Sequence, residues 1–357
     1  MADREKQPLP APSNRTDLPV PVKATINDIA RLAGVSKKTV SRIINESPLV
    51  REGTRDKVLA LMRQVGYVPD PQARGLAFRR SFLIGLVYDN PHAQYIVDIQ
   101  NGALDVLRGS GFELVVHPCD GRSANLVDGI LRFARQQKLH GVILLPPLSE
   151  SPAIADAMRS IHCRCAFIAS IRLDGDVSMI VSNERAAAAE VADHLASLGH
   201  SEIGLITGPS DHRSSHERRA GFVDALARHG IVLAPERIVE GSYTFESGVT
   251  GAEVLLSQIP RPSAIFACND EMAAGAYRTA HRRDLKIPGQ IAIVGYDDSP
   301  LAARLCPPLT TVRVATRDIG RHAAVLLLDE LPSGVSAPTI VVTPRLVTRE
   351  SCRPPIG

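Results

Sequence analysis

The chain has 357 residues and is 44% hydrophobic, with a formal net charge of +3. This length exceeds one ordinary domain and suffices for two or three, each with a sizeable core. No apolar run reaches the roughly 18 residues of a membrane-spanning helix, which excludes a transmembrane protein.

The N-terminal segment and the cysteines indicate the compartment. Residues 1–22 are rich in proline and polar side chains, so we expect them to be disordered. They contain no apolar stretch typical of a secretory signal, which predicts a protein retained in the cytoplasm. Most of the six cysteines should then be reduced core residues. The spacing of Cys163 and Cys165 does not fit a zinc site, so we expect no metal.

Residues 25–45 predict two short helices joined by a tight turn. Thr25 and Asp28 fit a capping box, and Ser36 can cap the second helix. Gly34 supplies the backbone freedom that the turn needs. Apolar residues at helical spacing are expected to face inward, namely Ile29, Ala30, Ala33, Val40, Ile43 and Ile44.

The second predicted helix keeps a polar, basic face, which is typical of a helix that enters a DNA major groove. A solvated helical hairpin is the plain alternative. The charge distribution favours DNA, because residues 1–80 carry 15 Lys and Arg against 8 Asp and Glu, whereas the whole chain carries 41 and 38. The outward residues of this helix are Lys37, Lys38, Ser41, Arg42 and Asn45.

A third helix is predicted from Glu52 to Val65, and Arg51 provides no capping side chain at its start. Asp70 before Pro71 indicates a further short helix, which would be too short to be stable alone. A plain linker is the alternative for that segment. The inward residues expected in the third helix are Val58, Leu59, Met62 and Val65.

From residue 81 onward, short apolar runs alternate with helical stretches. This alternation predicts parallel sheets wrapped by helices, with enough chain for two lobes. The runs lie at 83–87, 113–116, 141–145, 203–207, 264–268 and 291–295.

Polar side chains follow several of these runs. Asn269 and Asp270 follow one predicted strand, and Asp297 and Asp298 follow another, while Arg218 lies near a helix start. Ligands of parallel α/β sheets bind beyond the carboxyl ends of the strands, so a cleft there is expected. Helix or turn capping is the plain alternative, and we expect it for Asp270 and Asp298.

Residues 25–45, followed by TRDKVLALMRQVGYVPDPQARGLA, resemble the DNA-binding headpiece of the LacI/GalR family of bacterial transcription regulators. The resemblance covers most of residues 24–352, through ACNDEMAAGA, VGYDDSPLA, PPLTTVR and LVTRESC. It implies a small all-α helix-turn-helix domain and a two-lobed, periplasmic-binding-protein-like α/β core whose parallel sheets are flanked by helices. The implied parts are a tail (1–22), the helix-turn-helix domain (23–68), a hinge and linker (69–80), an N-terminal lobe (81–181 and 312–340) and a C-terminal lobe (182–311 and 341–353).

The family resemblance implies that two subunits place their second helices in successive major grooves of a near-palindromic operator. Lys37 and Lys38 match base-reading positions, and Lys prefers guanine acceptors. Residues 70–77 match a hinge helix that folds in the minor groove, with Leu76 as the wedge. The implied DNA contacts are Thr25, Ser36, Lys37, Lys38, Thr39, Ser41, Arg42, Asn45, Tyr67, Ala73 and Leu76.

The same resemblance assigns effector contacts. Arg218, Asn269 and Asp297 match residues that hydrogen-bond ligand hydroxyls in sugar-responsive members, and Tyr243 matches an aromatic that stacks on the ligand. From the other lobe the candidates are Asp89, Asn90 and Tyr95. Arginine, aspartate and asparagine suit vicinal hydroxyls, so a sugar or glycoside is expected, while a purine stays open.

We therefore expect a sequence-specific repressor controlled by a small effector, with no catalytic residue and no cofactor. The chain ends shortly after ESC without a heptad tail, which predicts a homodimer. Inducer and co-repressor stay open, as do repression and activation. An exported binding protein would not need residues 25–76, and an enzyme would need a catalytic constellation that we do not find.

Overall fold

A computed structural model describes residues 24–44, 49–67, 81–90, 92–173, 177–329 and 337–355. The chain divides into an N-terminal unit, 1–79, and a core, 80–357. The predicted hinge at 70–77, with Ala73 and Leu76, lies outside the described residues, as does Asn45. Within the described ranges, no helix has the length and apolar character that crossing a bilayer requires.

In the part of the N-terminal unit that the structure describes, there are three helices, α1 (Ile26–Ala33), α2 (Lys37–Ile44) and α3 (Glu52–Gln64). The predicted capping box is confirmed, because Thr25 and Asp28 bond reciprocally at the start of α1. Gly34 ends α1 with φ 67° in the left-handed region that favours glycine. The Ser36 hydroxyl accepts a bond from the Thr39 amide at 3.0 Å, which confirms the predicted cap of α2.

The three helices share a small apolar core, and the predicted inner faces of α1 and α2 are confirmed by its members. The prediction for α3 is wrong in part, because Leu59 and Val65 are each 37% exposed. Val58 and Met62, one turn apart, supply the buried contact of α3. Arg51 makes no capping bond at the start of α3, as expected.

The first sheet of the core is six-stranded and parallel throughout, with the order β11-β5-β4-β3-β1-β2. The predicted apolar runs at 83–87, 113–116 and 141–145 are confirmed as strands. The strands are β1 (Leu83–Tyr88), β2 (Glu113–Pro118), β3 (Gly141–Leu144), β4 (Arg164–Ala169), β5 (Met179–Ser182) and β11 (Thr339–Val342).

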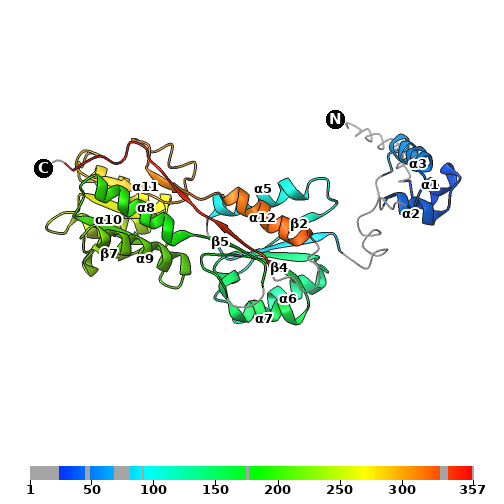
Figure 1. Ribbon diagram of the computed structural model, residues 1–357, viewed down its shortest axis with the longest axis horizontal. Helices are drawn as coiled ribbons and strands as arrows, with labels where there is room; N and C mark the ends of the chain where they lie inside the picture. Colours follow the sequence, from blue (N-terminus) through cyan, green and yellow to red (C-terminus); the bar gives the residue numbers. More distant parts are fainter. Residues whose placement is uncertain are drawn as a thin grey trace, which may run out of the picture. The chain divides into compact units, whose positions relative to one another are not determined.

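Helices cover both faces of this sheet, and alternate residues of a strand pack against opposite helix layers. Ile143 packs with α5 (Ala93–Leu107) and α12 (Thr316–Leu328). Its neighbour Leu144 packs instead with α6 (Leu126–Gln136) and α7 (Pro152–Ser160). Figure 1 shows these two helix pairs on opposite sides of the sheet. This double cover explains the runs of buried residues in the inner strands β1, β3 and β4, whereas the edge strands β2 and β11 have no fully buried residue.

The second sheet is four-stranded and parallel, with the order β7-β6-β8-β9. Around it, α8 packs against α9 and α10 against α11. The predicted runs at 203–207, 264–268 and 291–295 are confirmed as strands. The elements are β6 (Ile203–Thr207), β7 (Ile238–Glu240), β8 (Ala264–Ala267), β9 (Ala292–Val294), α8 (Glu184–Ser197), α9 (Arg213–Arg228), α10 (Phe245–Leu256) and α11 (Asp270–Arg282).

Three passages of the chain connect the two sheets and their helices. The first runs from β5 into α8, and the second from β10 (Thr311–Arg313) into α12. The third runs from β11 into β12 (Arg345–Val347), which pairs antiparallel with β10. In Figure 1, this third passage is drawn in dark red and runs from one lobe to the other. The described residues of the core also include short 3-10 turns at Leu148–Glu150 and Pro235–Arg237.

Candidate functional site

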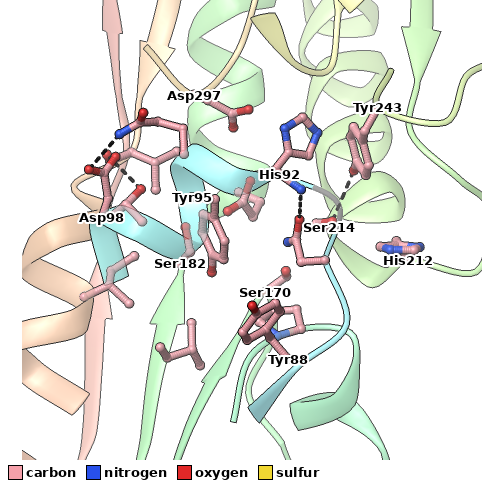
Figure 2. A pocket seen from close by; sticks show the side chains of 18 of the residues that line it. Tyr88, His92, Tyr95, Asp98, Ser170, Ser182, His212, Ser214, Tyr243 and Asp297 are labelled. Carbon is pink, nitrogen blue, oxygen red and sulfur yellow. Dashed lines mark hydrogen bonds between the residues drawn. The ribbon is translucent and has the colours of Figure 1, made fainter. Parts of the chain in front are cut away.

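A cavity of about 920 Å³ lies between the two lobes, within the size range of small-molecule sites. Its walls come from the carboxyl end of β1 in one lobe and from α9 and the loop after β9 in the other. Figure 2 shows side chains from both lobes converging on it. Six of the predicted effector residues line the cavity, namely Asp89, Asn90, Tyr95, Arg218, Tyr243 and Asp297.

Arg218 is held rigidly at the floor of the cavity. Its Nε donates to the Glu184 carboxylate at 2.6 Å, and its Nη1 donates to the Cys268 carbonyl at 2.5 Å. Its guanidinium lies 3.7 Å from the centroid of the Tyr296 ring. Both partners of the ion pair are buried, so the charge of Arg218 is balanced within the protein.

Asp297 follows β9 in an unusual backbone conformation, with φ 110°. Positive φ is rare outside glycine and is often kept at functional sites. Its side chain is 37% exposed and lies 3.9 Å from Nη1 of Arg218. Burial raises the pKa of Asp297, and the Arg218 charge opposes that rise. The carboxyl group is therefore placed to accept or donate a bond to a cavity ligand.

The two aspartates expected to be structural are engaged within the protein. Asp270 accepts bonds from the amide and hydroxyl of Ser299 and from the hydroxyl of Thr311. Burial raises the pKa of Asp270 to about 6. Asp298 pairs with Arg313 at 2.6 Å and Arg349 at 2.5 Å. Together they hold the loop after β9 that positions Asp297.

Tyr243 also has a positive φ, 59°, before α10. Its hydroxyl shares a hydrogen bond with Ser215 at 2.8 Å and lies 3.2 Å from the Ser214 hydroxyl. Two histidine rings meet it edge-on, with centroids at 6.1 Å for His92 and 5.9 Å for His212 (Figure 2). The ring is thus fixed in one orientation at the cavity wall.

We expected the side chain of Asn269 to be open to a ligand in the cleft, but it is buried. It is 1% exposed and does not line the cavity. Its Oδ1 caps α11 by accepting from the Met272 amide at 2.9 Å, and its Nδ2 donates to the Tyr243 carbonyl at 2.9 Å. The same Nδ2 lies 3.0 Å from Nε2 of His92. The sequence placed Asn269 correctly at a strand end, but His92 covers it.

The candidates from the first lobe shape the cavity's other wall. Asp89 accepts a bond from the Gly121 amide at 2.9 Å, and Asn90 accepts one from the His92 amide at 2.8 Å. Burial raises the pKa of the Tyr95 hydroxyl, which keeps it neutral and able to donate. Asp89 and Asn90 therefore order the loops that border the cavity.

Sequence reasoning missed several lining residues, because their partners are distant in the sequence. Glu184 precedes its partner Arg218 by 34 positions, and no local pattern links them. His92 comes two residues after Asn90 in the same strand-end loop, so strand-end position could have found it. Further missed lining residues are Asp98, Ser170, Ser182, His212 and Ser214 (Figure 2).

The N-terminal unit presents the polar face predicted for α2. Lys37 and Lys38 are exposed, while Ser41 and Arg42 are half-buried. Thr39 shares a hydroxyl bond of 2.9 Å with Ser36, which holds it at the helix cap. Of the other DNA candidates, Thr25 is exposed at the cap of α1 and Tyr67 packs partly against the apolar core of the unit.

A helix-turn-helix unit joined to a two-lobed α/β core with a cleft between its lobes defines the class of ligand-responsive DNA-binding proteins. Residues 25–70 match the family described as bacterial regulatory proteins, lacI family. Residues 192–352 match the periplasmic binding protein-like domain. The chain is also 32% identical over 329 residues to the ribose operon repressor of Haemophilus influenzae, covering 92% of this chain and 98% of the relative.

The chain therefore belongs to the lacI family of bacterial regulatory proteins, and it is a sequence-specific DNA-binding transcriptional regulator. Solved structures agree with this conclusion. The Lac repressor dimer bound to operator and the anti-inducer ONPF matches with a TM-score of 0.76 and 28% identity, covering 92% of this chain and 99% of that one. The CelR–cellobiose complex matches with a TM-score of 0.70 and 28% identity, covering 92% and 100%. The predicted fold class is confirmed.

Proposed function

We propose that this regulator is a repressor whose affinity for its operator is set by a sugar or glycoside bound between the lobes. The observation that carries the proposal is the cavity itself, which both lobes line. A ligand that contacts both lobes binds one relative pose more tightly than another. Such differential affinity is what shifts a conformational equilibrium.

The side chains around the cavity support a polyhydroxylated effector. Asp89 and Asp297 can accept hydrogen bonds from ligand hydroxyls, and the neutral Tyr95 hydroxyl can donate one. Tyr243 offers an aromatic surface for the C–H face of a sugar. The names of the relatives point the same way, since one is a ribose operon repressor and another is complexed with cellobiose. Asn269 becomes a further contact once His92 moves away.

On DNA, we propose a homodimer on a near-palindromic operator. Lys37 and Lys38 reach base edges in the major groove, while Thr39, Ser41 and Arg42 position α2 on phosphates. Leu76 enters the minor groove at the dyad, and a change of lobe pose separates the paired hinge segments. The remaining proposed contacts are Thr25, Ser36, Asn45, Tyr67 and Ala73.

We propose that the chain acts on DNA in the cytoplasm and catalyses no reaction on its effector. Selection of genomic fragments by the purified protein, followed by release with a panel of sugars, tests this function. Enrichment of a near-palindrome that one sugar releases is the expected result. If a purine released the protein from the palindrome and no sugar did, the proposed effector class would be wrong. If no DNA site were enriched, operator binding would be contradicted. If a sugar were converted to a product, the protein would be an enzyme.

A further inference from the structure

The side-chain amide of Asn269 makes three contacts inside the protein. The Oδ1 atom accepts from the Met272 amide at the start of α11. The Nδ2 atom lies 2.9 Å from the Tyr243 carbonyl and 3.0 Å from Nε2 of His92. Since an NH2 group has two protons, these two contacts exhaust it. No N–H of Asn269 is left to donate to a ligand in this conformation.

The cap of α11 determines which way this amide points. Turning the side chain over would bring Nδ2 against the Met272 N–H and leave both without an acceptor. Nδ2 therefore faces His92 and can only donate to it. His92 must accept through Nε2, which requires a neutral imidazole with its proton on Nδ1.

This hydrogen bond joins the two lobes across the cleft. His92 follows β1 and stands at the N-cap position of α5 in the first lobe, where its side chain makes no capping bond. Asn269 caps α11 in the second lobe. The His92 ring also meets the Tyr243 ring of the second lobe edge-on at 6.1 Å. Figure 2 shows His92 reaching Tyr243 at the cavity. Because Asn269 is 1% exposed, little water competes for the bond.

We propose that His92 is a positioning residue that latches the two lobes together by occupying the amide of Asn269. The effector displaces His92 from this amide when it binds, so the latch and the ligand compete for one group. The competition step rests on the proposed effector site. The latch itself does not, and it can be measured without any effector.

The latch makes lobe closure depend on pH. Burial lowers the pKa of His92, with Arg218 of α9 acting in the same direction and the Tyr243 carbonyl opposing it. The other titratable groups nearby are the Tyr243 hydroxyl and, along the same ring, His212. Asp297 lies in the same cavity. The latched pose favours neutral His92, so the latch is complete above its ordinary pKa of about 6.5 and weakens as the pH falls below that.

Distances between the lobes test this proposal in the full-length protein. Spin labels on genetically encoded ketone residues at exposed Arg135 of α6 and Arg219 of α9 leave the native cysteines unmodified. Pulsed electron resonance then gives the distance distribution at pH 8 and pH 5.5. The matched variants are His92→Leu, which removes the acceptor, and His92→Gln, which keeps a non-titrating one. His212→Gln is the control, because His212 meets the same tyrosine ring at nearly the same distance.

We expect the wild type to be closed at pH 8 and to have a lower closed-to-open ratio at pH 5.5, by up to about tenfold, because pH 5.5 lies about one unit below the ordinary histidine pKa of about 6.5. His92→Leu should be open at both pH values, His92→Gln closed at both, and His212→Gln like the wild type. If the distance distribution changed neither with pH nor in His92→Leu, the proposed latch would be contradicted. The latch would also be contradicted if the pH response disappeared in His212→Gln and persisted in His92→Leu. Failure of operator release by sugars would instead count against the proposed function alone.

Discussion

Arg218 contributes to stability as well as to the proposed effector site, because Glu184 is buried with it. Replacing Arg218 by Met should destabilise the core by about 3–5 kcal/mol, since it leaves the carboxylate unpaired in a buried place. Urea unfolding monitored by circular dichroism measures the loss. The double variant with Glu184→Gln removes both charges and should recover most of it. Equal losses in the single and double variants would show that the ion pair is not the cause.

Lys37 is the residue at which base preference is tested most directly. Lys37→Ala should relax the preference at one position of each half-site, a discrimination of about 1–3 kcal/mol. Binding-site selection by sequencing measures it. Lys57→Ala is the control, because Lys57 is also exposed but lies on α3. An unchanged selected motif with Lys37→Ala would remove this residue from base reading.

Individual site residues were predictable where a strand end determined their place. Asp297 was found because it follows a parallel strand, where polar residues face a shared edge. Arg218 lies within α9, and the family resemblance assigned it. His92 could not be seen as the cover of Asn269, because the two are 177 positions apart and meet only when the lobes pack. Glu184 was missed for the same reason. Sequence patterns report local geometry, whereas these contacts are set by tertiary packing.

At the scale of elements, the start of α3 is a weak point. Arg51 makes no side-chain bond to the free amides there, so Arg51→Ser should stabilise the helix start by about 1 kcal/mol. Hydrogen exchange of the α3 amides in the full-length protein measures this. Arg51→Ala separates the loss of charge from the gain of a cap. Equal protection in the two variants would mean that the serine does not cap.

Helix α9, which carries Arg218, packs against α8 through a glycine. A Cβ at Gly221 would lie 2.0 Å from the Arg185 carbonyl, so Gly221→Ala should force the helices apart and cost about 1–3 kcal/mol. Gly129→Ala in α6 is the control, since nothing lies within 4 Å of its Cβ, and it should be neutral or stabilising. Thermal unfolding compares them. Similar melting temperatures for the two variants would contradict the close approach of α8 and α9.

The positions of helices and strands were more predictable than the side-chain contacts between them. Apolar runs of strand length predicted β1, β6 and β8 to within a residue, because both faces of a parallel sheet are buried. Leu59 and Val65 were assigned inward on periodicity alone, yet a short three-helix unit buries only the part of α3 that faces its partners. Burial thus depends on how many neighbours an element has, which its own sequence does not state.

At the scale of the whole molecule, the two lobes are joined by three passages of chain, and β10 and β12 pair beside the cleft. We propose that a ligand in the cleft changes the relative pose of the lobes through these passages. A coupling that changes operator affinity tenfold requires about 1.4 kcal/mol of differential ligand affinity. A small number of effector hydrogen bonds made in one pose and not in the other would be enough.

Control of operator binding by the cleft between the lobes is tested most directly by a titration of effector against the protein–operator complex. Fluorescence anisotropy of the selected operator follows DNA binding while the sugar that releases it is added. The wild type should change its operator Kd about tenfold or more. Asp297→Asn should keep the sugar-free operator Kd but need roughly tenfold more sugar, because it loses one hydrogen bond between the carboxyl group and the sugar. An unchanged sugar midpoint in Asp297→Asn, together with one in Arg218→Met, would contradict control from this cleft.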